Sequence, residues 1–314
     1  MSFYNNLPLV DNSLDRHGIF RGDSAWIEEK LSAPNTLFIA NWNNRFPVQD
    51  NGQIYLLSKA QLDELSDEQL NYSYLGQMTD RDQAHIFSSE IVKPQVATED
   101  WKSLRRINID DPAAGLATYS QGLTNWHNKY KFCTHCGTAL ELLDGGNRML
   151  CQNQQCKQEI FPRIEPAIIV LVTYQDQCLL ANGHKYKGST KMHSCLAGFM
   201  ETGEDFDMAV RREVWEETGV ELTDIIYRAN QPWPFPQGLM IGFHAEAKTQ
   251  QLEFHDGEIN SAQWLTAEQI MHAVEENEIL LPSPKSISYY LLAEWFLDQT
   301  QIDLAEFMKN RWPS

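Results

Sequence analysis

The chain of 314 residues is predicted to have a mixed α/β fold, and three features of the sequence support this expectation. After about residue 163, short apolar runs alternate with amphipathic segments, which is typical of strands and helices that pack in layers. Four of the six cysteines cluster between Cys133 and Cys156, which indicates a small separate module. Scattered strand-like runs precede this cluster. We therefore expect an N-terminal α+β domain at residues 1–128, a cysteine module at 129–162 and an α/β domain at 163–314.

Local patterns predict the individual elements. The continuous apolar run at 167–172 suits a strand that is buried on both faces, and prolines at 282 and 284 separate the last two helical segments. Strands are expected at residues 36–40, 54–57, 167–172, 178–181, 194–197, 224–229, 239–245 and 261–265. Helices are expected at residues 113–127, 206–218, 266–275 and 286–297.

The net charge of −18 argues against broad electrostatic binding of nucleic acid, which requires lysine and arginine to neutralise phosphates. It does not argue against a nucleotide ligand, because a bound cation can offset the charge of the ligand locally. No apolar run reaches 18 residues, so we expect no membrane span. The first residues lack the pattern of a secretory signal, and the cytoplasm is the expected location.

The clustered cysteines have the spacing of a metal site. The pairs are Cys133-x2-Cys136 and Cys151-x4-Cys156, separated by fourteen residues. Four thiolates from two tight turns can close a tetrahedron around Zn²⁺, and such a closed site stabilises a fold rather than catalysing a reaction. We therefore expect one structural Zn²⁺ per chain. The remaining thiols, Cys178 and Cys195, lie in apolar runs and are expected to be buried.

Two alternatives remain open for this module. The first is a nucleic-acid-binding zinc ribbon, which nearby basic residues support. These are Lys129, Lys131, Arg148 and Lys157. The second is that His135 replaces one of the cysteines as a ligand. With four cysteines present, an exposed position is the simpler expectation for this histidine.

A cluster of carboxylates on one helix is the most informative feature of the sequence. Glu213, Glu216 and Glu217 are spaced i, i+3 and i+4, so they share one helical face. Val210 and Val214 share another face, which can pack on a core. Two carboxylates about 4 Å apart repel each other by roughly 4 kcal/mol at an effective dielectric constant near 20. A divalent cation relieves this repulsion; the alternative is a solvated acidic face.

The residues around these carboxylates fit a longer pattern. The segment from Gly198 to Val220 matches G-x5-E-x7-R-E-U-x-E-E-x-G-U, where U is a bulky aliphatic residue, at every constrained position. This segment resembles the Nudix box. The resemblance implies an α/β/α sandwich with a mixed sheet, in which a loop–helix–loop binds two or three Mg²⁺ or Mn²⁺ ions against a diphosphate. It implies metal ligands at the carbonyl of Ala197 and at Glu213, Glu216, Glu217 and the downstream Glu258. It assigns orienting roles to Glu204 and Arg212.

A second motif narrows the resemblance. The segment from Asn230 to Met240 is similar to S-Q-P-W-P-F-P-x-S-x-M, which marks the NADH pyrophosphatase branch of the Nudix hydrolases, and a zinc ribbon before the Nudix domain is the layout of that branch. Asn230 and Gly238 replace the two serines. Three prolines stiffen the segment, so that Trp233 and Phe235 can stack on nicotinamide or adenine. The alternative is a proline-rich loop that packs its aromatic side chains into a core.

The same resemblance implies further substrate contacts. Phe161 and Phe199 match aromatic residues that sandwich the base, although a tyrosine is usual at the first position. Ser288 matches a backbone contact, and Arg105 matches an arginine that contacts substrate. The implied substrate-binding residues are Phe161, Phe199, Gln231, Pro232, Trp233, Pro234, Phe235, Pro236, Gln237, Gly238, Ser288 and Arg105.

The resemblance implies hydrolysis of the pyrophosphate bond of NADH or NAD⁺, which yields NMN(H) and AMP. The implied catalytic residues are Glu213, Glu216, Glu217, Arg212 and Glu204; the sequence does not identify which glutamate acts as the base. One alternative is cleavage of the same bond in the NAD cap of RNA. A second, from another class, is a non-catalytic nucleotide sensor, which degenerate box glutamates would mark. The family also suggests a homodimer.

Overall fold

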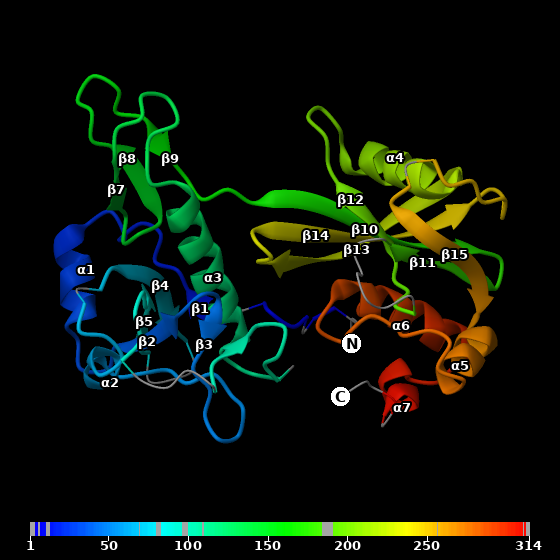
Figure 1. Cartoon of the computed structure of the whole chain (residues 1–314), viewed down its shortest axis with the longest axis horizontal. Helices are drawn as coiled ribbons and strands as arrows, with labels where there is room; N and C mark the ends of the chain where they lie inside the picture. Colours follow the sequence, from blue (N-terminus) through cyan, green and yellow to red (C-terminus); the bar gives the residue numbers. More distant parts are fainter. Residues whose placement is uncertain are drawn as a thin grey trace. The chain divides into compact units, whose positions relative to one another are not determined.

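The computed structural model describes residues 4–5, 7–10, 13–68, 70–79, 83–95, 100–108, 110–183, 191–255, 257–309 and 311. The chain forms two compact units (Figure 1). The N-terminal unit comprises Pro8–Ile164 together with Pro232–Gln237, and the C-terminal unit comprises Met1–Leu7, Glu165–Gln231 and Gly238–Ser314. The short piece 232–237, which lies in the second predicted motif, therefore belongs to the N-terminal unit.

The N-terminal unit is built on a mixed four-stranded sheet of order β1-β4-β5-β2. Its strands are β1 (Leu14–Asp15), β4 (Tyr72–Met78), β5 (His85–Glu90) and β2 (Leu37–Asn41). β2 and β5 are parallel, whereas the other neighbours are antiparallel. Two short strands, β3 (Arg45–Phe46) and β6 (Lys102–Ser103), form a separate antiparallel pair.

Helices cover both faces of this sheet because successive residues of a strand point to opposite sides. Ile39, Leu75 and Ile86 pack with side chains of α3 (Ala114–Lys129). Residues next to these in the same strands point to the other face. Among them, Phe38 and Phe87 pack with α1 (Ser24–Leu31) and α2 (Lys59–Asp63). The N-terminal unit therefore has two apolar cores, one on each side of its sheet.

One predicted strand in this unit is wrong. Residues 54–57 form only isolated bridges, Val48 with Ile54 and Phe38 with Leu57. The two ends of the segment pair with different partners, so no continuous ladder can form despite the β-prone composition. The neighbouring prediction at 36–40 corresponds to β2, and the helix expected at 113–127 corresponds to α3.

The cysteine module is a small antiparallel sheet of β7 (Leu140–Leu143), β8 (Arg148–Cys151) and β9 (Glu159–Ile160). Its β7–β8 turn lies against the N-terminal sheet. The Tyr74 backbone amide donates to the carbonyl of Gly145 at 2.8 Å, and the side-chain Nδ2 of Asn147 donates to the Tyr74 carbonyl at 2.9 Å. A Cβ on Gly146 would lie 2.5 Å from the Ser73 hydroxyl oxygen, so the close approach requires glycine there.

The C-terminal unit contains a six-stranded mixed sheet in which β13-β14-β10-β11-β15 are neighbours and β12 pairs with β10. Its strands are β10 (Glu165–Tyr174), β11 (Gln177–Gly183), β12 (Leu196–Phe199), β13 (Leu222–Trp233), β14 (Gly238–Ala247) and β15 (Ile259–Thr266). β10 is parallel to β14 and antiparallel to β11 and β12. Residues 167–172 of this central strand are all buried, as their apolar run predicts.

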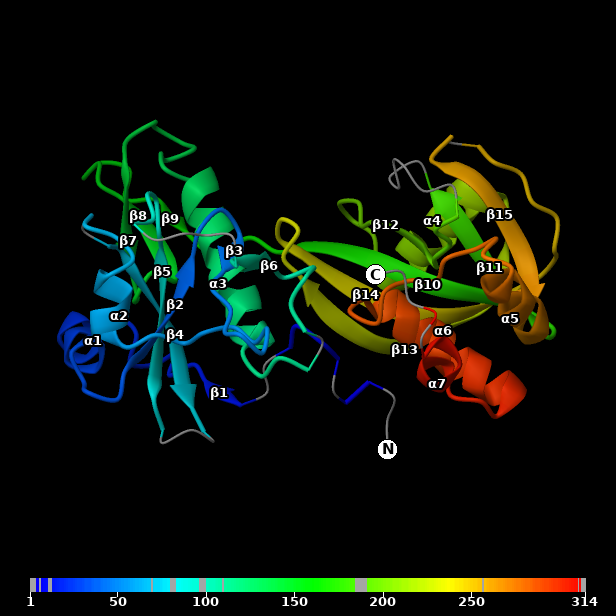
Figure 2. The ribbon, with the colours of Figure 1, turned by 60° about the horizontal axis from the view of Figure 1, so that its bottom comes forward.

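Helices lie on both faces of this sheet, as Figures 1 and 2 show for α4 and α6. Val210 and Val214 of α4 pack on Ile168 and Val170 of β10, which confirms the predicted anchoring face. The helices are α4 (Phe206–Thr218), α5 (Ala267–Glu275), α6 (Ile287–Thr300) and α7 (Leu304–Met308). The predicted α/β/α sandwich with a mixed sheet is thus confirmed. None of the helices in the described ranges has the length and apolar character needed to cross a bilayer.

The structure corrects the boundaries of two elements in this unit. β12 begins at Leu196, later than predicted, because Ser194 forms an isolated bridge with Ala181 instead. β13 continues to Trp233 instead of ending near residue 229. Pro232 is compatible with this strand because β13 lies at the edge of the sheet. The stiff loop expected from the prolines is therefore the tip of a hairpin at residues 234–237.

Candidate functional site

The carboxylate helix α4 has the predicted bounds, and local interactions define both of its ends. Asp205 is the N-cap, and its carboxylate accepts a hydrogen bond from the Met208 amide at 2.8 Å. Gly219 ends the helix with a φ of +71°, a left-handed conformation that favours glycine. These caps position the three glutamates on a helix whose opposite face is buried in the sheet.

Arg212 and Glu204 form a two-pronged ion pair. The arginine donates from Nε to Glu204 Oε1 at 2.6 Å and from Nη2 to Glu204 Oε2 at 2.9 Å. These hydrogen bonds lower the pKa of Glu204 to about 2, and they raise the pKa of Arg212. Both groups therefore stay charged at neutral pH. Such a bidentate pair fixes the plane of the guanidinium group.

The same guanidinium group holds two of the predicted metal ligands. Its Nη1 donates to Glu213 Oε1 and to Glu216 Oε2, each at 2.9 Å. Its Nη2 also donates to the carbonyl of Phe199 at 2.9 Å, at the end of β12. Arg212 thus links the carboxylates of α4 to the strand beside them, which is the geometry expected of an orienting residue.

Gly198 provides the space for Glu213, a role that the sequence reading did not assign. A Cβ placed on Gly198 would lie 1.9 Å from Glu213 Cδ and about as close to both carboxylate oxygens. The Glu213 side chain is only 15% exposed, and burial raises its pKa. The carboxylate therefore lies directly on the backbone of β12. The requirement for glycine at the first position of the Nudix box was the signal that could have revealed this contact.

A Gly198→Ala variant is expected to lose activity by at least about tenfold without losing its fold, because the new methyl group displaces Glu213 from its place on β12. Pyrophosphate cleavage and thermal unfolding, measured together, test this expectation. Gly122→Ala serves as the control, because no atom lies within 4 Å of a Cβ at that helical position. The control is expected to keep its activity and to gain up to about 1 kcal/mol of stability. Equal activity of the two variants would contradict the role of Gly198.

The remaining predicted carboxylate ligands lie on α4 and just before β15. Glu217 is buried, whereas the side chain of Glu216 is 41% exposed. Glu258 lies just before β15, and the pKa of Glu213 is raised first by burial and then by the charges of Glu216 and Glu258. Among the described residues, only the four cysteines form a group of three or more potential ligands that converge as a metal site requires. Arg212 holds Glu213 and Glu216 instead. The donors are all carboxylate oxygens, which suits Mg²⁺ or Mn²⁺.

The hairpin tip at 234–237 is held by residues of α3 in the N-terminal unit. Asn125 on α3 donates to the carbonyl of Pro236 at 2.9 Å, and the buried Gln121 donates to the carbonyl of Pro234. The rings of Trp233 and Phe235 are 5.0 Å apart and pack partly on the core beneath α3. The sequence reading missed both amide side chains because no motif contains them.

The structure brings Arg105 to this hairpin tip. Its guanidinium carbon lies 4.0 Å from the ring centre of Phe235 and 5.3 Å from that of Trp233. Three of the predicted substrate-binding residues therefore lie together. The rings of Trp233 and Phe235 pack on the core of the N-terminal unit, and each also has a face toward the guanidinium group of Arg105. Whether they also contact substrate stays a prediction.

Two other predicted substrate contacts have partners inside the C-terminal unit. The buried Gln231 side chain donates to the carbonyl of Lys285 and accepts from the Ile287 amide, both at 2.8 Å. It thereby caps α6, whose N-cap residue Ser286 makes no side-chain bond. The hydroxyl of Ser288, also buried, accepts from the Cys195 amide at 3.2 Å. Both side chains hold the fold around α6.

The other predicted substrate-binding residues differ in exposure. Phe161, after β9, is 53% exposed, and Phe199, at the end of β12, is 59% exposed, so each ring offers a surface on which a base could stack. Gln237 is buried, and Gly238 begins β14 opposite Glu165. The backbone of Ala197 lies in β12, paired with Ile169 of the central strand.

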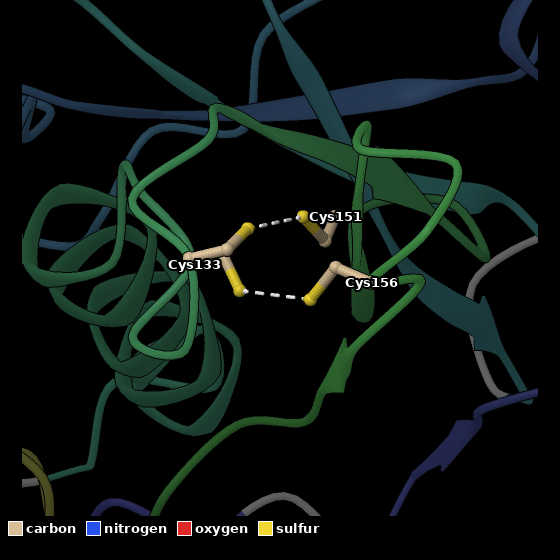
Figure 3. Close-up of side chains that lie close together, drawn as sticks. Cys133, Cys151 and Cys156 are labelled. Carbon is tan, nitrogen blue, oxygen red and sulfur yellow. Dashed lines mark hydrogen bonds between the residues drawn. The ribbon is translucent and has the colours of Figure 1, made fainter.

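The four cysteines converge as their spacing predicts. Their sulfur atoms all lie within 4.8 Å of one another, with Cys133 and Cys156 at 3.8 Å and Cys136 and Cys151 at 3.4 Å (Figure 3). Tetrahedral Zn–S bonds of about 2.3 Å place sulfurs about 3.8 Å apart, whereas a disulfide requires about 2 Å. The site therefore fits Zn²⁺.

The two turns that present these cysteines are alike. Gly137 follows Cys136 with a φ of +73°, and Lys157 follows Cys156 with a φ of +49°. In the first turn the Gly137 amide donates to the carbonyl of Cys133 at 2.8 Å. In the second, the Lys157 amide donates to the carbonyl of Asn153 at 3.0 Å, so residue 153 takes the place of the first cysteine and the x4 spacing is accommodated. His135 is exposed and lies outside the group of four.

Comparison with known proteins agrees with this geometry. Residues 163–283 match the family described as the NUDIX domain. The chain is 33% identical over 214 residues to the NAD-capped RNA hydrolase NudC of Pseudomonas syringae, covering 67% of this chain and 73% of that protein. It is 36% identical over 217 residues to NudC of Mycobacterium bovis, covering 65% and 68%.

A human relative extends the similarity further along the chain. The NAD-capped RNA hydrolase NUDT12 of Homo sapiens is 28% identical over 332 residues, covering 90% of this chain and 71% of that protein. The match therefore includes most of the N-terminal unit. On the strength of the NUDIX match, these relatives and the carboxylate site on α4, the chain belongs to the NudC-type branch of the Nudix hydrolases.

Proposed function

We propose that the chain hydrolyses the pyrophosphate bond of NADH or NAD⁺ and releases NMN(H) and AMP. One observation supports the proposal most strongly. The guanidinium group of Arg212 donates hydrogen bonds to the carboxylates of Glu204, Glu213 and Glu216 at the same time. The curated relatives are named for hydrolysis of NAD-capped RNA, which supports NAD as the recognised group.

The proposed chemistry depends on oxygen ligands from α4 and β12. Two or three Mg²⁺ or Mn²⁺ ions bound there would neutralise the diphosphate and activate the attacking water. Glu213, Glu216, Glu217, Glu258 and the carbonyl of Ala197 are the residues that would hold them. Arg212 keeps two of these carboxylates oriented, and Glu204 keeps Arg212 in place. A carboxylate of this set takes the proton of the water, and none of them is singled out as the base.

Substrate recognition is proposed to use the aromatic residues. Four aromatic side chains offer flat faces for the nicotinamide and adenine rings: Trp233 and Phe235 in the β13–β14 hairpin, and the exposed Phe161 and Phe199. Stacking of one base on such a face contributes about 1–3 kcal/mol. Arg105, which lies over Phe235, provides a positive charge beside the rings. Gln121 and Asn125 would hold the tip in a shape that binds the ligand.

A second candidate substrate is RNA that carries NAD at its 5′ end, because the relatives are named for this activity. The bond that breaks is the same. The zinc module supplies basic residues for the RNA chain, although Arg148 is already paired with Asp144 and Glu159. Lys131 and Lys157 are exposed, so they can contact phosphates.

One assay tests the proposal and separates the two substrates. The full chain is incubated with Mn²⁺ and either NADH or NAD-capped RNA, and AMP or the uncapped RNA end is measured at two salt concentrations. We expect cleavage of both, with the rate on RNA falling as salt rises because phosphate contacts are screened. ADP-ribose, tested alongside, measures how much the nicotinamide contributes. Binding of NADH with no release of AMP would instead support the sensor alternative.

Three further predictions accompany this function. We propose a homodimer, as the family resemblance implies, and a cytoplasmic location. The division into domains at residues 128 and 162 separates the zinc module, whereas the structure groups this module with the N-terminal unit. Sedimentation of the full chain tests the dimer.

A further inference from the structure

The N-terminal unit contains a pocket of about 500 Å³ that is bounded by its sheet, by the last turns of α3 and by the zinc module. β4 and β5 contribute Ser73 and Ser88 to its lining, and α3 contributes Thr124 and His127. A volume of this size suits a small-molecule ligand. None of the residues that line the pocket was predicted to bind substrate or a catalytic metal, so its function is open.

The zinc module supplies an apolar wall of this pocket. Leu140 and Leu142 are two residues apart on β7, so their side chains point to the same side of the strand. Met149 of β8 pairs with Leu142 and also lines the pocket. The flat face of a heterocyclic ring can lie against these side chains and exclude water from them.

Two hydroxyl groups of the pocket have no hydrogen-bond partner in the part of the chain that the structure describes. They belong to Ser73 and Thr124, which are each 7% exposed, and both oxygens remain accessible to solvent. Thr118, earlier on the same helix, is also 7% exposed, but its hydroxyl donates to the carbonyl of Ala114 at 2.9 Å. Because buried polar groups nearly always have a partner, the hydroxyls of Ser73 and Thr124 are available to a molecule in the pocket.

His127 adds a hydrogen-bond acceptor to the lining. Its Nε2 lies 2.8 Å from the carbonyl oxygen of Gly146, and a carbonyl can only accept, so Nε2 carries the proton of this bond. Burial lowers the pKa of His127, which keeps the ring neutral at neutral pH and leaves Nδ1 as an acceptor. Among the described residues no group donates to Nδ1. A ligand that bonds to this atom must therefore offer an N–H or O–H group.

The charged groups of the pocket disfavour a phosphate. Two carboxylates, Glu68 and Glu90, line it together with one ammonium group, that of Lys131. Glu68 is paired with Lys93 at 3.6 Å, and the carboxylate of Glu90 accepts from the Asn128 side chain at 2.6 Å. The neutral amide of Asn128 leaves the charge of Glu90 in place, so a phosphate group would be repelled there. An uncharged ligand is favoured.

We propose that this pocket binds a nucleoside that carries no phosphate, with its base against the apolar wall of β7 and β8 and its N–H and O–H groups bonded to Ser73, Thr124 and His127. A nucleoside combines the flat apolar ring and the hydrogen-bond donors that these walls require. The proposal does not depend on the function proposed above, because none of these residues belongs to the predicted active site.

Isothermal titration calorimetry of the full chain with adenosine tests this. We expect the wild-type chain to bind adenosine with a dissociation constant below about 1 mM. Thr124→Val keeps the shape of the side chain without its hydroxyl, and it is expected to raise the dissociation constant by about 3- to 10-fold, the effect of one lost hydrogen bond. Ser73→Ala is expected to have an effect of similar size. Adenosine that is dimethylated on its amino group offers no N–H there and is expected to bind more weakly than adenosine.

Thr118→Val is the matched control. Thr118 lies on the same helix as Thr124 and is equally buried, but its hydroxyl is bonded within the helix and it does not line the pocket. This variant is therefore expected to bind adenosine as the wild type does. Melting temperatures of all variants show that each is folded.

Three outcomes would overturn the inference. If adenosine at about 1 mM gives no binding heat with the wild-type chain, the pocket does not take a nucleoside. If adenosine binds equally to the wild type, Thr124→Val and Ser73→Ala, it occupies another site, such as the predicted base-binding aromatic residues. Equal binding of adenosine and its dimethylated form would refute the requirement for a hydrogen-bond donor on the base.

Discussion

A Glu217→Gln variant is expected to lose at least about 100-fold in kcat for release of AMP from NADH. Glu217 is buried on α4 at 4% exposure, and as a predicted metal ligand its charge would contribute to holding a divalent cation. The amide has almost the same shape but no charge, so the fold is preserved while charge neutralisation or proton transfer is lost. The rate at saturating NADH and Mn²⁺ measures the effect.

The control for this prediction is Glu221→Gln. Glu221 lies just beyond Gly219, and its exposed carboxylate pairs with Lys248 at 2.8 Å. This pair is worth little at the surface, so the variant is expected to turn over NADH at nearly the parental rate. A Glu217→Gln enzyme with parental activity and an unchanged melting temperature would refute the assignment of α4 as the catalytic helix.

A Cys151→Ser variant is expected to lose its zinc and to destabilise the N-terminal unit by several kcal/mol. Four converging sulfurs bind Zn²⁺ with a free energy that also folds small modules, about 10–16 kcal/mol in isolated zinc fingers. Cys151 ends β8, which carries the turn that is bonded to Tyr74 of the N-terminal sheet. Loss of the metal is therefore expected to weaken contacts beyond the module. Zinc content by mass spectrometry and thermal unfolding measure both effects.

Cys178→Ala provides the comparison for the zinc prediction. Cys178 is buried in β11 of the C-terminal unit, away from the group of four. Its removal is expected to leave one zinc per chain and to cost only the packing of a small side chain. If Cys151→Ser retained one zinc per chain with an unchanged unfolding transition, the structural role of the four cysteines would be wrong.

Local sequence signals determined the elements that carry the chemistry. The spacing of Glu213, Glu216 and Glu217 places them on one helical face, and the structure has α4 between the predicted residues. The cysteine spacing likewise predicts the four converging sulfurs. Both predictions depend on residues close in sequence, where helix geometry and tight turns leave few alternatives.

Contacts between distant segments were not accessible in this way. Gln231 was expected to contact substrate because of its place in a motif, yet its amide caps α6, more than fifty residues away. The proline-rich segment was expected to be a stiff loop, and the structure adds that Asn125 and Gln121 of α3 hold the carbonyls of its tip at 234–237. An amide side chain can satisfy many partners, so its type does not reveal which one it meets.

The sequence alone determined the helix with its carboxylates, the four-cysteine site and the membership of a family, because each depends on a short motif with fixed spacing between its residues. Only the tertiary structure decided that Gly198 makes room for Glu213, that Arg212 holds two glutamates at once, and that the zinc module and α3 enclose a pocket beside the N-terminal sheet. These contacts depend on which strands are neighbours, and neighbouring strands are chosen by the packing of the whole sheet rather than by any one segment.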